Sequence, residues 1–150
     1  MKTLLLSPEL FRAEGGIARI MRLYLRALCE SASAGDEVRS LTLNDPAATD
    51  PRLGHYSTAS LKETIGCAGQ KGAFVRRALT LARRSDRAIC GHLHQLPILW
   101  LARKFNRKLQ YCLVAHGIEV WRPYRWLETC ALCSAHRIFC VSDYTRQQLL

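Results

Sequence analysis

Short apolar runs alternate with amphipathic patterns along most of this chain. The run Thr3-Leu4-Leu5-Leu6-Ser7 stops at Pro8, which is typical of a buried strand. After a loop that closes on Gly15-Gly16, apolar residues recur at the spacing of one helix face. These residues are Ile17, Ile20, Met21, Tyr24, Leu25 and Leu28. The start of the chain therefore predicts a strand, a glycine loop and a helix.

The same alternation continues downstream, where polar and apolar side chains first alternate and later form unbroken apolar runs. Strands are expected at 37–43, 88–91, 109–115 and 137–141, with a further short strand at 55–59. Helices are expected at 73–84, 97–105 and 126–134, and a last helix from Ser142-Asp143 onward. Residues 66–72 carry three glycines and predict a loop or a frayed helix start.

Strands that alternate with helices pair in parallel, because each helix returns the chain to the same end of the sheet. Unbroken apolar runs such as 109–115 suit strands that are covered on both faces. The prediction is an α/β fold with a Rossmann-like parallel sheet and helices on both faces. No internal repeat or interdomain linker divides residues 1–150, so one domain is expected.

Candidate binding residues follow the predicted strands. In open parallel α/β sheets, ligands bind beyond the carboxyl ends of the strands. The residues found there are Gly15, Gly16, His92, His94, His116, Gly117 and Ser142. A glycine pair before a helix lets a phosphate approach the helix N-terminus, although a turn without any ligand has the same pattern.

His116 is the strongest single candidate for a catalytic residue. A histidine that directly follows a buried strand and precedes a glycine can face the crevice and donate a hydrogen bond to a ligand oxygen. The alternative is a structural histidine that nearby backbone groups satisfy. His92 and His94 could equally only shape their loop. Glu119 could bind a hydroxyl or be a solvated loop carboxylate.

The composition adds a strong positive charge. Lysine and arginine exceed aspartate and glutamate by ten, which favours anionic partners. Four arginines lie on one side of the helix expected at 73–84: Arg76, Arg77, Arg83 and Arg84. This stripe is either a solvated face or a contact for anionic lipid headgroups. The chain shows no nucleic-acid signature, and its aromatic residues do not interleave with the basic ones, so no nucleic-acid partner is expected.

Seven cysteines are an odd number, and no secretion signal precedes them. Three of them, Cys90, Cys112 and Cys140, fall in apolar runs where a thiol behaves as a small hydrophobe. Cys130 and Cys133 form a lone C-x-x-C, which we interpret as core packing because a zinc site needs four ligands. We therefore expect a reduced, cytoplasmic protein with no metal ion and no structural disulfide.

An ordered set of segments resembles the N-terminal domain of family 4 glycosyltransferases. The set begins with the segment of residues 2–9 and with residues 15–19, which carry the double glycine. It continues through Gly35-Asp36-Glu37-Val38, Gly91-His92-Leu93-His94 and Val114-Ala115-His116-Gly117-Ile118-Glu119-Val120-Trp121. It ends with the segment 135–145, so the resemblance covers nearly the whole chain.

The resemblance implies the N-terminal, acceptor-side half of a GT-B fold. Such enzymes transfer a sugar from a nucleotide-sugar to an acceptor hydroxyl with retention and usually without a metal ion. Gly15 and Gly16 would approach the donor diphosphate or the acceptor, and His116 would contact the donor sugar. The acceptors are often cell-envelope glycans or lipid-linked sugars, which places the expected activity in polysaccharide or glycolipid synthesis at the cytoplasmic side of the membrane.

The family's second domain supplies the basic residues on the diphosphate and the pocket for the donor base. None of that is present within these 150 residues, so we expect the chain alone to be inactive or nearly so. The alternative to a transferase half is a non-catalytic α/β module that binds a protein partner or an anionic surface. An unrelated nucleotide binder is a third reading, and the missing G-x-G-x-x-G disfavours it.

Overall fold

The computed structural model describes residues 1–149, apart from the side chain of Ile118. Among these residues, six strands form one fully parallel sheet in the order β3-β2-β1-β4-β5-β6. The strands are β1 (Lys2–Ser7), β2 (Glu37–Thr42), β3 (Leu61–Gly66), β4 (Arg87–Cys90), β5 (Gln110–Ala115) and β6 (Arg137–Cys140). The α/β fold with a Rossmann-like parallel sheet is confirmed.

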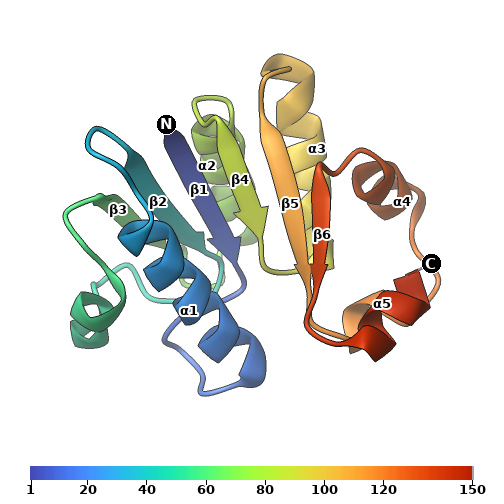
Figure 1. Ribbon diagram of the computed structural model, residues 1–150, viewed down its shortest axis with the longest axis horizontal. Coiled ribbons are helices and arrows are strands. Elements are labelled where there is room, and N and C mark those ends of the chain that lie inside the picture. The colour runs from blue at the N-terminus through green and yellow to red at the C-terminus, as the bar shows by residue number, and fades with distance from the viewer. Residues whose placement is uncertain (150) are drawn as a thin grey trace.

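Helices connect the strands and cover the sheet on both faces (Figure 1). They are α1 (Gly16–Glu30), α2 (Lys71–Ala82), α3 (Leu96–Phe105), α4 (Trp126–Cys133) and α5 (Asp143–Leu149). Three short 3₁₀ helices are η1 (Pro51–Tyr56), η2 (Leu93–Gln95) and η3 (Ile118–Val120). From β1 the chain first adds β2 and β3 on one side, and it then crosses back to add β4, β5 and β6 on the other side. The direction of strand addition therefore reverses between β1 and β4, and this position is the topological switch point.

Two apolar clusters hold the layers together. On one face, Met21 and Leu25 of α1 pack with Leu5 and Val114 of the sheet. On the other face, α2, α3 and α4 form one helical layer, and each buries apolar side chains in a single cluster with β1, β4 and β5. Leu5 faces α1 while its neighbours Leu4 and Leu6 face the helical layer, because successive side chains of a strand point to opposite faces.

The expected elements agree with the structure except in one region. Residues 55–59, predicted to be a strand, belong to η1 and the turn after it. The strand of this region is β3, and Gly66 is its last residue rather than part of a loop. β3 is an edge strand with Lys62 and Glu63 exposed, so it lacks the apolar run that marks the inner strands.

Candidate functional site

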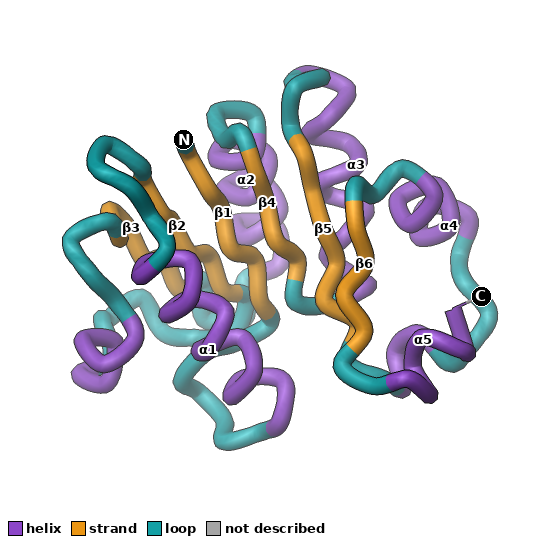
Figure 2. Tube along the Cα trace, in the orientation of Figure 1, coloured by secondary structure: helices purple, strands orange, loops and turns teal. Residues whose placement is uncertain are grey.

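The candidate residues lie at one edge of the sheet. β1, β4, β5 and β6 run parallel, so the loops that follow them all emerge at their carboxyl ends (Figure 2). Gly15-Gly16 belong to the β1 loop, His92 and His94 to the β4 loop, and His116 to the β5 loop. With β4 between them, β1 and β5 are about 10 Å apart. The glycine pair and His116 therefore share an edge that includes the switch point.

The glycine pair leaves the N-terminus of α1 open. Gly15 and Gly16 are exposed, and a Cβ added at either position would meet no atom within 4 Å. No side chain caps α1, its first turn contains no acidic residue, and its first backbone bond runs from Arg19 N–H to the Gly15 carbonyl at 3.0 Å. The amides of the first turn are thus free to hydrogen-bond an anion.

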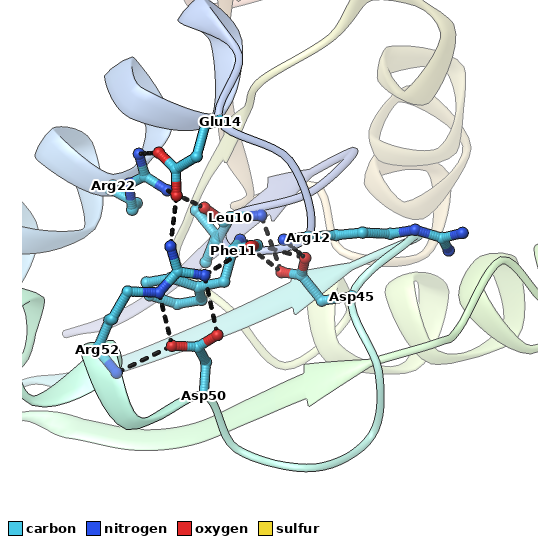
Figure 3. Close-up of polar contacts among 8 residues, drawn as sticks. All are labelled: Leu10, Phe11, Arg12, Glu14, Arg22, Asp45, Asp50 and Arg52. Carbon is cyan, nitrogen blue, oxygen red and sulfur yellow. Dashed lines mark hydrogen bonds and ion pairs between the residues drawn. The ribbon is translucent and has the colours of Figure 1, made fainter.

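The loop before the glycines is fixed by Asp45, which is 7% exposed and follows β2 (Figure 3). Its carboxylate accepts backbone N–H bonds from Leu10 at 2.8 Å, Phe11 at 3.2 Å and Arg12 at 2.9 Å. These three amides are already satisfied by a carboxylate of the protein. A bound anion would therefore have to use the α1 amides instead.

Arg22 of α1 fastens the same loop from the other side. It is 6% exposed and donates hydrogen bonds to the Leu10 carbonyl at 2.8 Å and to the Glu14 carboxylate at 2.9 Å. Its guanidinium carbon lies 5.9 Å from the ring centre of Phe11 and 5.8 Å from that of Tyr56. This arrangement joins the loop, α1 and η1 in one polar and aromatic cluster.

Arg52 of η1 completes the cluster. It donates to the Phe11 carbonyl at 2.7 Å, to Asp50 at 2.9 and 3.0 Å, and to Glu14 (Figure 3). Hydrogen bonds from Arg22 and then Arg52 lower the pKa of Glu14, so its carboxylate stays charged between the two arginines. The segment that leads to the glycine pair is therefore held in one conformation by several charge-assisted bonds.

His116 lies at the end of β5 with both ring nitrogens buried and without a hydrogen-bond partner. Burial lowers the pKa of the imidazole, and the nearby Glu119 carboxylate and the Gly91 backbone oppose this shift only in part. The ring is therefore neutral at physiological pH, with one donor and one acceptor nitrogen. A buried imidazole with unused donor and acceptor capacity fits a polar ligand at this point.

Two neighbours shape the position of His116. Its backbone N–H donates to Glu119 Oε1 at 2.6 Å, and Glu119 is only 6% exposed. The hypothesis of a solvated Glu119 is therefore wrong, because the carboxylate is buried in the turn after β5. Gly117 has φ = +145°, and an added Cβ would lie 3.1 Å from Trp121. Only glycine fits this turn without strain.

His92 and His94 have different surroundings. Their rings stack with centres 5.0 Å apart, and His92 Nδ1 accepts a bond from the His94 amide at 3.2 Å. Burial lowers the pKa of His92, and Glu119 opposes this shift, whereas His94, His116 and Arg122 add to it. His92 thus belongs to the electrostatic neighbourhood of His116.

His94 is exposed and bonded to a buried carboxylate. Its Nδ1 lies 2.8 Å from Oε1 of Glu128 in α4. The Glu128 carboxylate also accepts hydrogen bonds from the Arg122 guanidinium at 2.7 and 3.1 Å and from the Arg125 amide at 2.8 Å. The Arg122 hydrogen bond is the largest contribution that lowers the pKa of Glu128 to about 2. His94 and Arg122 therefore tie the β4 and β5 loops to α4.

Ser142 and the cysteines occupy structural positions. Ser142 Oγ accepts the Thr145 amide at 3.1 Å and caps α5, as the sequence predicts. Cys90 is fully buried, as expected for a small hydrophobe. Cys133 is exposed, so the prediction that it packs in the core is wrong. Among residues 1–149, no three histidine, cysteine or acidic side chains are placed to hold a metal ion.

One cavity lies away from the candidate site. Its volume is about 330 Å³, and it opens at the amino ends of β4, β5 and β6, beside the C-terminal half of α1. Arg87, Gln110 and His136 are among its lining residues. This position is opposite to the carboxyl edge that carries Gly16 and His116, so the cavity is not the candidate site.

Sequence reasoning missed the residues that hold the site in place: Glu14, Arg22, Asp45, Arg52, Arg122 and Glu128. Most of them bond to residues that are distant in the sequence, such as Leu10 and Asp45, which are 35 positions apart. No local sequence pattern reveals such contacts. Glu128 did leave a signal, because a glutamate at the third position of a helix commonly bonds the amide that precedes it.

A family model described as Glycosyltransferase Family 4 matches residues 14–150. The match covers most of the chain and includes every candidate residue from Gly15 to Ser142. No curated protein matches the chain.

Proposed function

The chain belongs to glycosyltransferase family 4, and we propose that it is the acceptor-side domain of a retaining enzyme with a GT-B fold. The enzyme would transfer a sugar from a nucleotide-sugar donor to an acceptor hydroxyl. The acceptor we propose is a cell-envelope glycan or a glycolipid. As the resemblance implies, the reaction would use no metal ion. The proposed location is cytoplasmic, which rests on the odd number of cysteines and on the placement of Cys90, Cys112 and Cys140 in apolar runs.

The observation that supports this proposal best is His116. Its two ring nitrogens are buried and unpaired, and a buried polar group without a partner costs about 1–3 kcal/mol. A sugar hydroxyl of the donor could satisfy one of them and so recover this cost. Because the pKa of His116 is lowered, the ring would meet this hydroxyl as a neutral group.

The open N-terminus of α1 gives the second contact. The uncapped amides beside Gly15 and Gly16 carry partial positive charge at the same edge of the sheet. We propose that they approach the donor diphosphate or an anionic group of the acceptor. Asp45 and Arg22 would act as positioning residues, because they hold the loop that leads to the glycine pair.

The test is a pair of histidine variants in the enzyme that joins this domain to its donor-binding domain. His116→Ala should lower turnover with a nucleotide-sugar about 100-fold or more while the protein remains folded by circular dichroism. His136→Ala is the matched control. His136 directly precedes β6, so it lies at the amino edge of the sheet, away from the candidate site. Turnover of His116→Ala equal to that of the unmodified enzyme would contradict the proposal. Equal losses in both variants would show that the effect is not specific to the site.

A further inference from the structure

The helical layer of α2, α3 and α4 presents a surface that its packing does not explain. α3 lies in the middle and contacts both other helices (Figure 1). Large apolar side chains of α3 and α4 are exposed on this layer. Phe105 is 64% exposed, Trp126 is 72% exposed, and Leu101 and Leu127 are also exposed. Exposed aromatic and aliphatic groups that lie together on one layer mark an interaction site more often than single ones do.

Cations surround these apolar groups. Lys104 Nζ lies 4.7 Å from the ring centre of Trp100, and the Arg83 guanidinium lies 4.9 Å from that of Phe105. Trp100 also meets Trp126 edge to face at 6.3 Å. The aromatic and basic side chains are thus interleaved on this surface, which corrects the expectation that aromatic and basic residues do not interleave.

A cavity of about 330 Å³ lies within this surface, between α3 and the end of α4. It is lined by Trp100, Arg103, Lys104, Arg107 and Ser134. Arg103 donates to the Ser134 carbonyl at 2.7 Å, which fixes one wall. Neither Arg103, Lys104 nor Arg107 forms an ion pair within residues 1–149. Their positive charges are available to an external anion.

The charged side chains of this helical layer are almost all basic. Glu128 is the only carboxylate in α2, α3 and α4, and it is buried and paired with Arg122. The stripe predicted on α2 is divided by the structure. Arg83 contacts Phe105 and joins the surface, whereas Arg76 and Arg77 line a separate groove beside Glu63 of β3. The positive surface is therefore centred on α3 and not on α2.

We propose that this surface docks the domain on an anionic lipid bilayer. Lys104, Arg103 and Arg107 would contact headgroup phosphates, and Phe105 and Trp126 would enter the interfacial layer. Among residues 1–149 no helix is long and apolar enough to span a bilayer. The proposed contact is with the surface alone.

The structure favours a bilayer over a nucleic acid. Single-stranded nucleic acid binds by stacking its bases on open aromatic faces. Here Lys104 covers a face of Trp100 and Arg83 covers a face of Phe105, so neither of these faces is open to a stacking base. The layer covers one face of the sheet (Figure 1), whereas His116 and Gly16 lie at its carboxyl edge, so docking would leave that edge open.

The test is sedimentation of the purified chain with vesicles, which requires no catalysis and so is independent of the proposed function. The chain should bind vesicles of equimolar phosphatidylcholine and phosphatidylglycerol and not vesicles of phosphatidylcholine alone. Lys104→Gln should weaken binding about fivefold, equivalent to the ~1 kcal/mol that one basic residue contributes near an anionic surface. A double variant, Phe105→Ser with Trp126→Ser, should weaken vesicle binding further. It should also abolish the vesicle binding that the unmodified chain retains at high salt concentration.

Arg26→Gln is the matched control for charge. Arg26 is exposed on α1, on the opposite face of the sheet, and pairs only with Glu30 at the surface. It should leave vesicle binding unchanged. Equal weakening by Arg26→Gln and Lys104→Gln would overturn the proposal, because attraction would then follow net charge alone. Equal binding to both vesicle types, or displacement from vesicles by a single-stranded oligonucleotide, would overturn it as well.

Discussion

Three histidines near one edge of the sheet have different chemical roles because their surroundings differ. His116 is buried without a partner, His92 is partly buried and accepts a backbone bond, and His94 is exposed and bonded to Glu128. Burial lowers the pKa values of His116 and His92. Only His116 keeps both nitrogens unused, and this distinguishes a candidate ligand-binding residue from two residues that organise a loop.

Glu128 gives a prediction at this scale. Its pKa falls from an ordinary 4.5 to about 2 in the folded protein, so the unfolded chain binds its proton first as the pH decreases. The stabilisation is therefore present above pH 4.5 and is lost as the pH falls toward 2. Glu128→Gln should lower the free energy of unfolding by about 2–3 kcal/mol at pH 7. Urea unfolding at a series of pH values measures this difference, which should shrink between pH 4.5 and 2. A difference that does not change with pH would contradict the assigned pKa.

Individual residues also show where sequence patterns stop being informative. The strand-then-histidine pattern located His116, and the Gly117 turn follows from its positive φ. The sequence did not reveal the burial of Glu119, and it predicted the environment of Cys133 incorrectly. The Glu119 carboxylate accepts the His116 amide within the turn after β5, and Cys133 is the last residue of the short helix α4. A residue's type and its local period do not contain this information.

At the scale of elements, the loop from Pro8 to Gly15 is the part that most needs support from outside. It has no regular secondary structure, and three of its amides depend on Asp45. Asp45→Ala should leave these amides unpaired and lower the free energy of unfolding by about 2–4 kcal/mol. Urea unfolding gives the total, and hydrogen exchange at Leu10, Phe11 and Arg12 should accelerate.

Asp86→Ala is the control for that loop. Asp86 accepts one backbone N–H through its side chain, from Lys2 at 2.7 Å, in an exposed position. Its removal should cost about 1 kcal/mol or less. Similar costs for the two variants, or unchanged exchange in the Asp45 variant, would show that Asp45 does not hold the loop.

The inner strands and most helices were predictable because each carries its own apolar period, as α1 and β5 do. β3 was not, because an edge strand with Lys62 and Glu63 has no continuous apolar run. η1 was not predicted either, because short 3₁₀ helices lack a repeating face and depend on contacts such as those of Arg52. Elements that tertiary contacts stabilise are therefore the ones that the sequence pattern does not show.

At the scale of the whole molecule, a parallel sheet with a switch point explains why distant segments meet at one edge. Residues near positions 15, 92 and 116 lie at the same edge of the sheet because β1, β4 and β5 are neighbours that run in one direction. Alternating strands and helices predicted the parallel pairing. The strand order itself came from the structure, because no local pattern states which strands are adjacent. The candidate site is thus a product of topology more than of any one motif.

The same scale gives the final prediction, which concerns residues 1–150 expressed alone. A departing nucleoside diphosphate needs placed donors and cations to stabilise its charge. The open end of α1 contributes about 0.3–2 kcal/mol, whereas enzymes lower their barriers by at least about 8 kcal/mol. We therefore expect transfer from radiolabelled nucleotide-sugars to stay at background with residues 1–150 alone. Transfer should appear when a donor-binding domain is joined to the chain, and His116→Ala should then suppress it. Measurable transfer by the 150 residues alone would show that this domain carries the necessary cations itself.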